Sequence, residues 1–229
     1  RVWSSDVCSS DLPNLTPANR RERLIFANEH IHTDWKRIWS YDESYFNLIV
    51  SSSRGWVKTS TLQRIAPRKN TTLQDSISLC IVVAVSYNYK SALCFLPKNW
   101  TPDQLINVLA HKLLPSIQWD PTLHGCRSFL LDNDGRHLNR RVKDFLHQNN
   151  LDWIGQMPAN SPDLNPIENV FSIMKRHVRN KCPTTEKGLR EAIHEAWDLI
   201  DTQTLRNLFN SMPGRIQEVI EHEGDRIAY

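Results

Sequence analysis

The sequence predicts an α/β fold in which a mixed central sheet is flanked by helices. Three observations support this class: strand-like segments come first, strands and helices then alternate, and only helical segments follow. Hydrophobic residues make up 40% of the 229 residues and charged residues 23%, which is typical of a folded domain with a substantial core. The longest apolar run, Leu79 to Val85, has seven residues, too few to span a membrane.

The first half of the chain predicts a short helix followed by antiparallel strands. A helix is expected over 16–30, where Leu24, Ala27 and Asn28 share one face and Arg23 lies beside it. Strands are expected at 36–48, at 54–58, at 76–87 and at 91–96, the last two joined by a polar turn.

The second half predicts alternating elements and then helices. Thr101 is a good N-cap, Pro102 suits the first helical position, and Gln104 completes a capping box. Leu105, Val108, Leu109 and Leu113 form the apolar stripe of this helix. The later elements are expected as a strand at 127–131, a helix near 138–146, a strand at 151–154, and helices at 165–178, 184–200 and 202–220.

Three acidic residues lie where predicted strands end or a helix begins: Asp42, Asp132 and Glu168. Hard divalent cations such as Mg²⁺ prefer oxygen ligands, and two such ions can assist phosphodiester chemistry. Each acid also has a structural reading. Asp42 could simply end a strand, Asp132 could start an Asx-turn, and Glu168 could form a capping box with Asn165.

Three motifs contain these acids. They are Asp-Glu-Ser-x-Phe at 42–46, Asp-Asn-Asp-x-x-His at 132–137, and Ser-Pro-Asp-Leu-Asn-Pro-Ile-Glu-Asn at 161–169. In this order they resemble the signature blocks of mariner-superfamily transposases, in the aspartate–aspartate–glutamate branch, and the resemblance runs from about residue 15 to at least 178. It implies a ribonuclease H-like catalytic domain in which the three acids bind Mg²⁺ or Mn²⁺, as two ions. Such enzymes cleave DNA at transposon ends and join the 3′-hydroxyl to target DNA.

The resemblance also implies roles for the surroundings of the three acids. Four polar residues are expected to orient a ligand or loop by hydrogen bonding, with a direct part in the chemistry as the alternative: Asn133, Asp134, His137 and Asn165. Five cations are candidate DNA-phosphate contacts, with solvated surface as the alternative: Arg136, Arg140, Arg141, Lys175 and Arg179. DNA is the expected partner, a homodimer is one assembly the family allows, no membrane is involved, and the nucleus is the expected location.

The sequence departs from the family pattern in several places. The 35 residues between Asp132 and Glu168 are one more than usual in this branch, and we place the extra residue within 149–157. The stretch 71–78 lacks the usual glycines. Residues 3–12 resemble a translated sequencing adapter, so 1–14 are expected to be a non-native leader and 15–229 the catalytic domain. Helix-turn-helix modules are expected to be absent, which predicts weak, salt-sensitive DNA binding.

Two other functions remain open at this point. An inactive or domesticated transposase-derived protein could keep the fold as a DNA or protein interaction module. A generic nuclease of the same fold would cleave DNA without joining strands. The presence of Asp42, Asp132 and Glu168 together favours intact chemistry.

Overall fold

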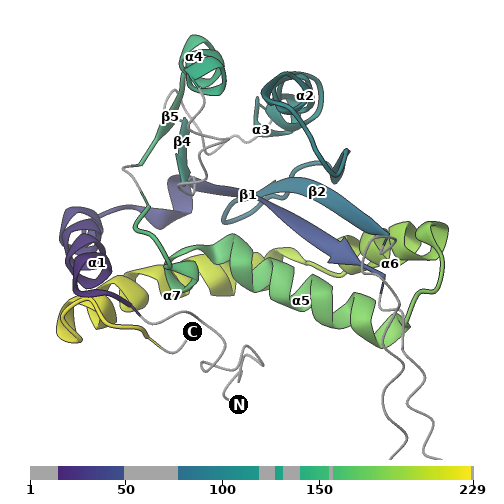
Figure 1. Ribbon diagram of the computed structural model, residues 1–229. Helices are drawn as coiled ribbons and strands as arrows, with labels where there is room; N and C mark the ends of the chain where they lie inside the picture. The colour runs from purple at the N-terminus through teal and green to yellow at the C-terminus, as the bar shows by residue number, and fades with distance from the viewer. Residues whose placement is uncertain (1–14, 49–76, 119–126, 131–139, 155–156, 228–229) are drawn as a thin grey trace, which may run out of the picture.

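A five-stranded mixed sheet lies between two layers of helices (Figure 1). The computed structural model describes residues 15–48, 77–118, 127–130, 140–154 and 157–227. The strands are β1 (Ile38–Asn47), β2 (Ser78–Val85), β3 (Cys94–Leu96), β4 (Arg127–Leu130) and β5 (Leu151–Trp153), in the sheet order β3-β2-β1-β4-β5. This arrangement confirms the predicted α/β class.

Seven α-helices occur among these residues. They are α1 (Pro17–His30), α2 (Pro102–Val108), α3 (Leu114–Gln118), α4 (Arg140–Gln148), α5 (Pro166–Lys181), α6 (Glu186–Asp198) and α7 (Thr202–Glu221). Two 3₁₀ turns, η2 (Trp35–Arg37) and η5 (Pro162–Leu164), and a π-helical turn, η4 (Leu109–Leu113), complete the list. In the part of the chain that the structure describes, no helix is both long and apolar enough to cross a membrane.

Strand β1 lies in the middle of the sheet and has a different neighbour on each side. It pairs antiparallel with β2, with Asp42 opposite Val83, and parallel with β4, with Ser40 opposite Leu130. β3 pairs antiparallel with β2, and β5 pairs parallel with β4. The predicted strand at 54–58 lies outside the described residues.

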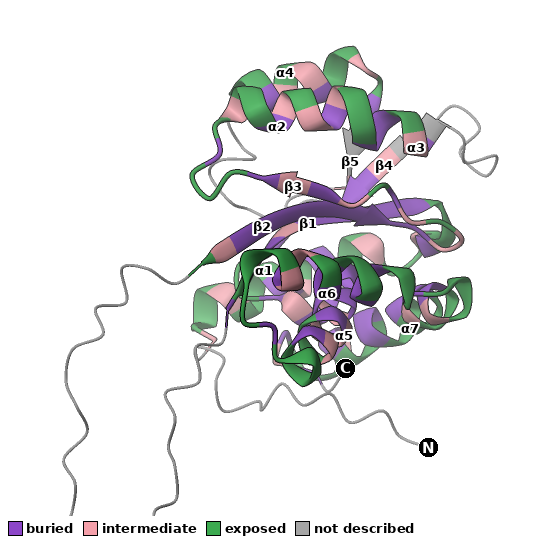
Figure 2. Cartoon of the chain, turned by 90° about the vertical axis from the view of Figure 1, so that its right-hand side faces the viewer, coloured by how far each residue is buried: buried purple, intermediate pink, exposed green. Residues whose placement is uncertain are grey.

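The side chains of β1 alternate between two hydrophobic cores, one on each face of the sheet. Figure 2 shows the helical layers on the two sides of the sheet, coloured by burial. Trp39 and Tyr41 pack with the helices α2 to α4, whereas Ile38 and Phe46 pack with α5, α6 and α7. Successive residues of a strand point to opposite faces of a sheet. Asp42 therefore faces the same layer as Ile38 and Phe46, which is the layer that contains α5.

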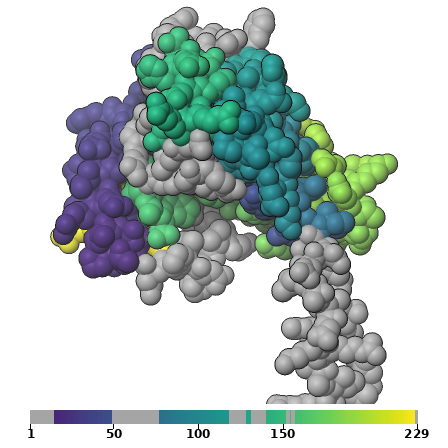
Figure 3. Space-filling model, turned by 45° about the horizontal axis from the view of Figure 1, so that its top comes forward, coloured from purple at the N-terminus to yellow at the C-terminus, as the bar shows by residue number. Residues whose placement is uncertain are grey.

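The layer formed by α2, α3 and α4 begins as the sequence predicts. The Thr101 hydroxyl accepts a hydrogen bond from the Gln104 amide (3.4 Å), and the Gln104 side chain accepts one from the Thr101 amide (2.9 Å). This is the predicted capping box. Helices α2 and α4 contact each other, and Figure 3 shows their surfaces side by side.

Helix α1 packs against α7 and the residues that follow α7, and its buried face differs from the prediction. Arg23, Phe26 and Ala27 are its buried residues, whereas Asn28, expected on the apolar face, is exposed. Asn28 instead donates a hydrogen bond to its own helix, at the Leu24 carbonyl (2.7 Å). The prediction was wrong because helical spacing gives the face of a residue but not the polar partner that lets an arginine be buried.

Gly224 lies where the chain after α7 meets α1. Its φ is +83°, and a Cβ atom on it would lie 2.1 Å from the Arg20 carbonyl oxygen. Only glycine fits such a left-handed backbone position against another main chain.

We predict opposite effects for alanine at two glycines of this region. Gly224→Ala should lower the free energy of unfolding by at least about 2 kcal/mol, because of its positive φ and the backbone overlap. Gly214→Ala, inside α7 with no atom within 4 Å of the added Cβ, should raise it by about 0.5–1 kcal/mol. Urea denaturation of both variants tests this, and equal shifts for the two would contradict the packing of Gly224 on α1.

Candidate functional site

Asp42 is a buried carboxylate in the central strand. Its relative exposure is 7%, and it faces the helical layer that contains α5. Its Oδ1 atom accepts a hydrogen bond from the Glu43 amide (2.7 Å), which orients the carboxylate. A buried carboxylate is costly unless hydrogen bonds or a cation compensate it, so this position is suited to a charged ligand.

Glu168 lies in the first turn of α5. Pro166 starts this helix, and the positive end of the helix dipole favours a carboxylate there. The capping box considered for Glu168 and Asn165 does not form: the Glu168 amide donates to the Asn165 carbonyl (3.1 Å), and the Asn165 amide donates to the Pro162 carbonyl (3.2 Å). A capping role therefore does not explain the glutamate.

Ser40 of β1 provides the cap that Asn165 does not. Its hydroxyl accepts a hydrogen bond from the Ile167 amide (3.2 Å), one of the amides that have no partner within a helix. The same hydroxyl donates to Oδ1 of Asn165. Ser40 and Asn165 are fully buried, so these contacts fix the start of α5 against β1. Asp42 follows Ser40 by two residues on the same face, and Glu168 follows Ile167 directly.

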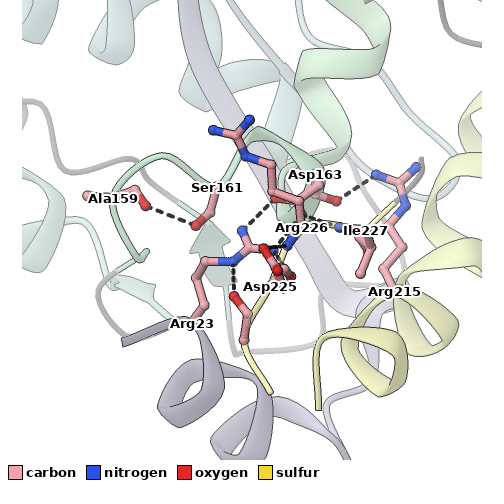
Figure 4. A network of polar contacts seen from close by, with 9 residues as sticks. Arg23, Ala159, Ser161, Asp163, Arg215, Asp225, Arg226 and Ile227 are labelled. Carbon is pink, nitrogen blue, oxygen red and sulfur yellow. Dashed lines mark hydrogen bonds and ion pairs between the residues drawn. The ribbon is translucent and has the colours of Figure 1, made fainter. Parts of the chain in front are cut away.

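Asp163, in the loop before α5, is the centre of a buried polar network (Figure 4). Arg23 of α1 donates two parallel hydrogen bonds to its carboxylate, one of them 2.7 Å long between Nη1 and Oδ1. The Ile227 amide also donates to this carboxylate (3.4 Å). A two-fold arginine–carboxylate pair fixes both partners in orientation as well as in distance.

Arg215 of α7 holds the same loop from the other side. Its Nη1 atom donates to the Asp163 carbonyl (2.9 Å) and to the Asn169 side-chain oxygen (2.9 Å). Asn169 is the residue next to Glu168. The backbone around Glu168 is therefore held on both sides, at Asp163 before it and at Asn169 after it.

Several predicted site residues lie outside the described residues. They are Asp132, Asn133, Asp134, Arg136 and His137. Within the described ranges, no group of three or more His, Cys, Asp or Glu side chains is placed to hold a metal ion. The structure thus brings Asp42 and Glu168 to adjoining elements, and the position of the third acid remains a prediction.

The four described cations proposed for DNA contact do not form one surface. Arg140 and Arg141 belong to α4, and Lys175 and Arg179 to α5, on the opposite side of the sheet (Figure 1). Arg141 is paired with Asp103 of α2 through a bond of 2.9 Å, and Arg140 lies 3.7 Å from Asp144. Lys175 and Arg179 are exposed and share a helical face with Glu168, seven and eleven residues before them.

The sequence of residues 37–190 matches the family model described as DDE superfamily endonuclease, over more than half of the chain. The chain belongs to this family. The resemblance to mariner-type transposases stated from the three motifs is confirmed.

Transposases of nematodes are among the relatives of this family member. It is 29% identical to the Tc3 transposase of Caenorhabditis elegans, over 95% of this chain and 65% of that protein. It is 27% identical to the Tcb2 transposase of Caenorhabditis briggsae, over 93% of this chain and 78% of the relative. The chain therefore spans just under two thirds of the Tc3 protein and somewhat more of Tcb2.

Solved structures of the Mos1 transposase share the fold. Its catalytic domain solved with Raltegravir and Mg matches with a TM-score of 0.75 and 15% identity, covering 94% of this chain and all of the other. A Mos1 paired-end complex with the left transposon end matches with a TM-score of 0.74 and 17% identity, over 93% of this chain and 64% of that one. These likenesses confirm the predicted ribonuclease H-like fold.

Three residues of this site were not singled out from the sequence: Ser40, Arg23 and Arg215. Ser40 precedes Asp42 by two residues in the same strand, which is a weak signal that both side chains face the same layer. Arg23 falls on the stripe that also carries Phe26 and Ala27, and Arg215 falls between Met212 and Val219 on the buried face of α7. The sequence does not show the partner of the two arginines, because Asp163 lies 140 residues from Arg23 and 52 residues from Arg215.

Ser40→Ala should lower the free energy of unfolding by about 1–3 kcal/mol. The reason is that the Ile167 amide and the Asn165 side-chain oxygen lose a buried partner. Urea denaturation measures this change.

Ser44→Ala is the matched control. Ser44 is buried on the same face of β1 and makes no hydrogen bond to α5 among the described residues, so its loss should cost less than about 1 kcal/mol. Equal destabilisation by the two substitutions would contradict the capping role of Ser40.

Proposed function

We propose that this family member is the catalytic domain of a DNA transposase that cleaves phosphodiester bonds at transposon ends and joins the 3′-hydroxyl to target DNA. Asp42, Asp132 and Glu168 are the carboxylates that carry this chemistry. One observation supports the proposal most directly: the Ser40 hydroxyl bonds the strand of Asp42 to the first turn of the helix of Glu168.

The register of β1 and β4 supports the inclusion of Asp132. Leu130, the last described residue of β4, pairs with Ser40 in a parallel ladder. In the sequence Asp132 follows Leu130 by two positions, as Asp42 follows Ser40. We propose on this sequence spacing that Asp132 is the third carboxylate of the site.

The donor set fits a hard divalent cation. All three ligands are carboxylates, and Mg²⁺ and Mn²⁺ prefer oxygen ligands and leave positions for the substrate phosphate. Mos1 transposase structures with Mg and with Mn are among the matches of the fold, and we propose the same metals here, as two ions. Such ions would activate the attacking oxygen and stabilise the leaving oxygen. The role of the protein is to fix the positions of the three carboxylates before the substrate binds.

The exposed face of α5 offers a path for the DNA backbone. Lys175 and Arg179 lie on the same helical face as Glu168, and the path along this face is about 16 Å long at 1.5 Å per residue. Two cations that follow a metal-binding glutamate could each contact a phosphate beside the cleaved bond. We therefore propose that Lys175 and Arg179 bind DNA, whereas Arg141 would first have to leave Asp103.

Assembly and location follow from the relatives and stay proposals. The Mos1 matches include paired-end complexes, and we propose that two copies of this chain act together on two DNA ends. The nucleus is the proposed location because the substrate is DNA. Specific recognition of the transposon ends is not assigned to any described residue.

Substitutions of the three acids should weaken metal binding. Asp42→Asn, Asp132→Asn and Glu168→Gln should each lower Mn²⁺ affinity by at least about 10-fold and abolish Mn²⁺-dependent nicking of supercoiled plasmid. Isothermal titration with MnCl₂ and gel electrophoresis measure the two effects. Glu191→Gln, an exposed carboxylate of α6, is the matched control and should change neither.

Two outcomes would separate the alternatives. Unchanged Mn²⁺ affinity in Asp132→Asn would contradict the proposed metal site. Normal Mn²⁺ binding without any nicking by the wild-type chain would favour a transposase-derived interaction module instead.

A further inference from the structure

We propose that Arg23 is a positioning residue for the catalytic centre: it holds Asp163 and thereby places the first turn of α5, which carries Glu168. The inference rests on the proposed function, because it concerns the readiness of the same carboxylate to bind metal. It also assigns α1 to the catalytic unit.

The Arg23 guanidinium is enclosed completely. Its relative exposure is 0%, and that of the Asp163 residue is 3%. Besides the two bonds to Asp163, its Nε donates to the Gly224 carbonyl (2.9 Å) and its Nη2 to the Asp225 carbonyl (3.0 Å). One arginine therefore joins α1, the loop before α5 and the segment after α7, which are far apart in sequence.

Geometry explains this pair better than net stability does. A buried ion pair recovers little more than the cost of removing both charges from water, and apolar residues of similar volume often stabilise a fold equally well. What the planar guanidinium adds is a fixed distance and angle to a carboxylate. The consequence of Arg23 is thus that the loop at Asp163 has a single position.

That position is transmitted to Glu168 over five residues. Asp163 lies in η5, whose Pro162 carbonyl accepts the Asn165 amide, and Asn165 then accepts the Ser40 hydroxyl. Arg215 fixes the same segment at two further points, because it donates hydrogen bonds to the Asp163 carbonyl and to the Asn169 side chain. A shift of Asp163 would therefore move the start of α5 relative to β1, and with it Glu168 relative to Asp42.

Two substitutions test this role in the full chain. Arg23→Lys keeps the charge and removes the two-pronged contact, and Asp163→Glu keeps the charge and lengthens the side chain by one methylene. In the folded protein, each should lower Mn²⁺ affinity by about 10-fold, the size typical of residues that orient metal ligands. Each should also speed hydrogen exchange of the Ile167 amide in the metal-free protein, because its bond to Ser40 loosens.

Two controls separate positioning from general stability. Arg20→Ala removes an exposed ion pair to Asp225 beside the buried network and should leave both readouts unchanged. Leu105→Ala removes a fully buried side chain in the other core, so it should lower stability without changing Mn²⁺ affinity of the folded protein.

The outcomes are distinguishable. Wild-type Mn²⁺ affinity and Ile167 exchange in both test variants would overturn the inference while leaving the proposed function intact. Failure of both test variants to fold would also overturn the inference, because the Arg23–Asp163 pair would then be required for folding of the whole domain. Absence of Mn²⁺ binding in the wild-type chain would overturn the proposed function, and exchange of the Ile167 amide would still test Arg23.

Discussion

The hydroxyl of Ser40 connects the two elements on which the site depends. A strand and a helix that pack through apolar side chains can slide by a fraction of a residue at little cost, but a buried hydrogen bond to a helix amide fixes one position. Here the Ile167 amide donates to the strand, and Asn165 accepts from it. The strand of Asp42 and the helix of Glu168 are thereby held in register before any ligand arrives, which is how a site avoids reorganisation during the reaction.

The residues of the motif at 161–169 have separate tasks, and most of these tasks concern position. Asp163 accepts hydrogen bonds from Arg23, and Asn165 accepts one from Ser40. Pro166 starts the helix, and the Asn169 side chain accepts a hydrogen bond from Arg215. Glu168 is the member that we assign to metal binding. A motif with one ligand and several positioning residues indicates that the direction of the glutamate matters as much as its charge.

The fold was largely predictable because its signals are local. The capping box at Thr101, the apolar and aromatic residues of β1, the continuous apolar run of β2 and the stripe of α5 are each local signals. The structure has these elements close to the expected bounds. The positioning of the site was not predictable, because a buried arginine or serine is recognised only by a partner far away in the chain. Arg23 was taken for a residue beside the apolar face, and Glu168 had a capping alternative that only the coordinates of Asn165 and Ser40 exclude. The three acids were identified by motif, and the structure adds the contacts that bring two of their elements together.

Diffraction from crystals grown with MnCl₂, recorded at the manganese absorption edge, tests the central claim most directly. We expect an anomalous peak about 2.0–2.3 Å from carboxylate oxygens of Asp42 and of Glu168, with Asp132 beside it. A protein in which Ser40 remains bonded to Ile167, yet the carboxylates of Asp42 and Glu168 lie more than about 10 Å apart with manganese on neither, would contradict the account, because two-metal sites need ligands around ions only about 4 Å from each other.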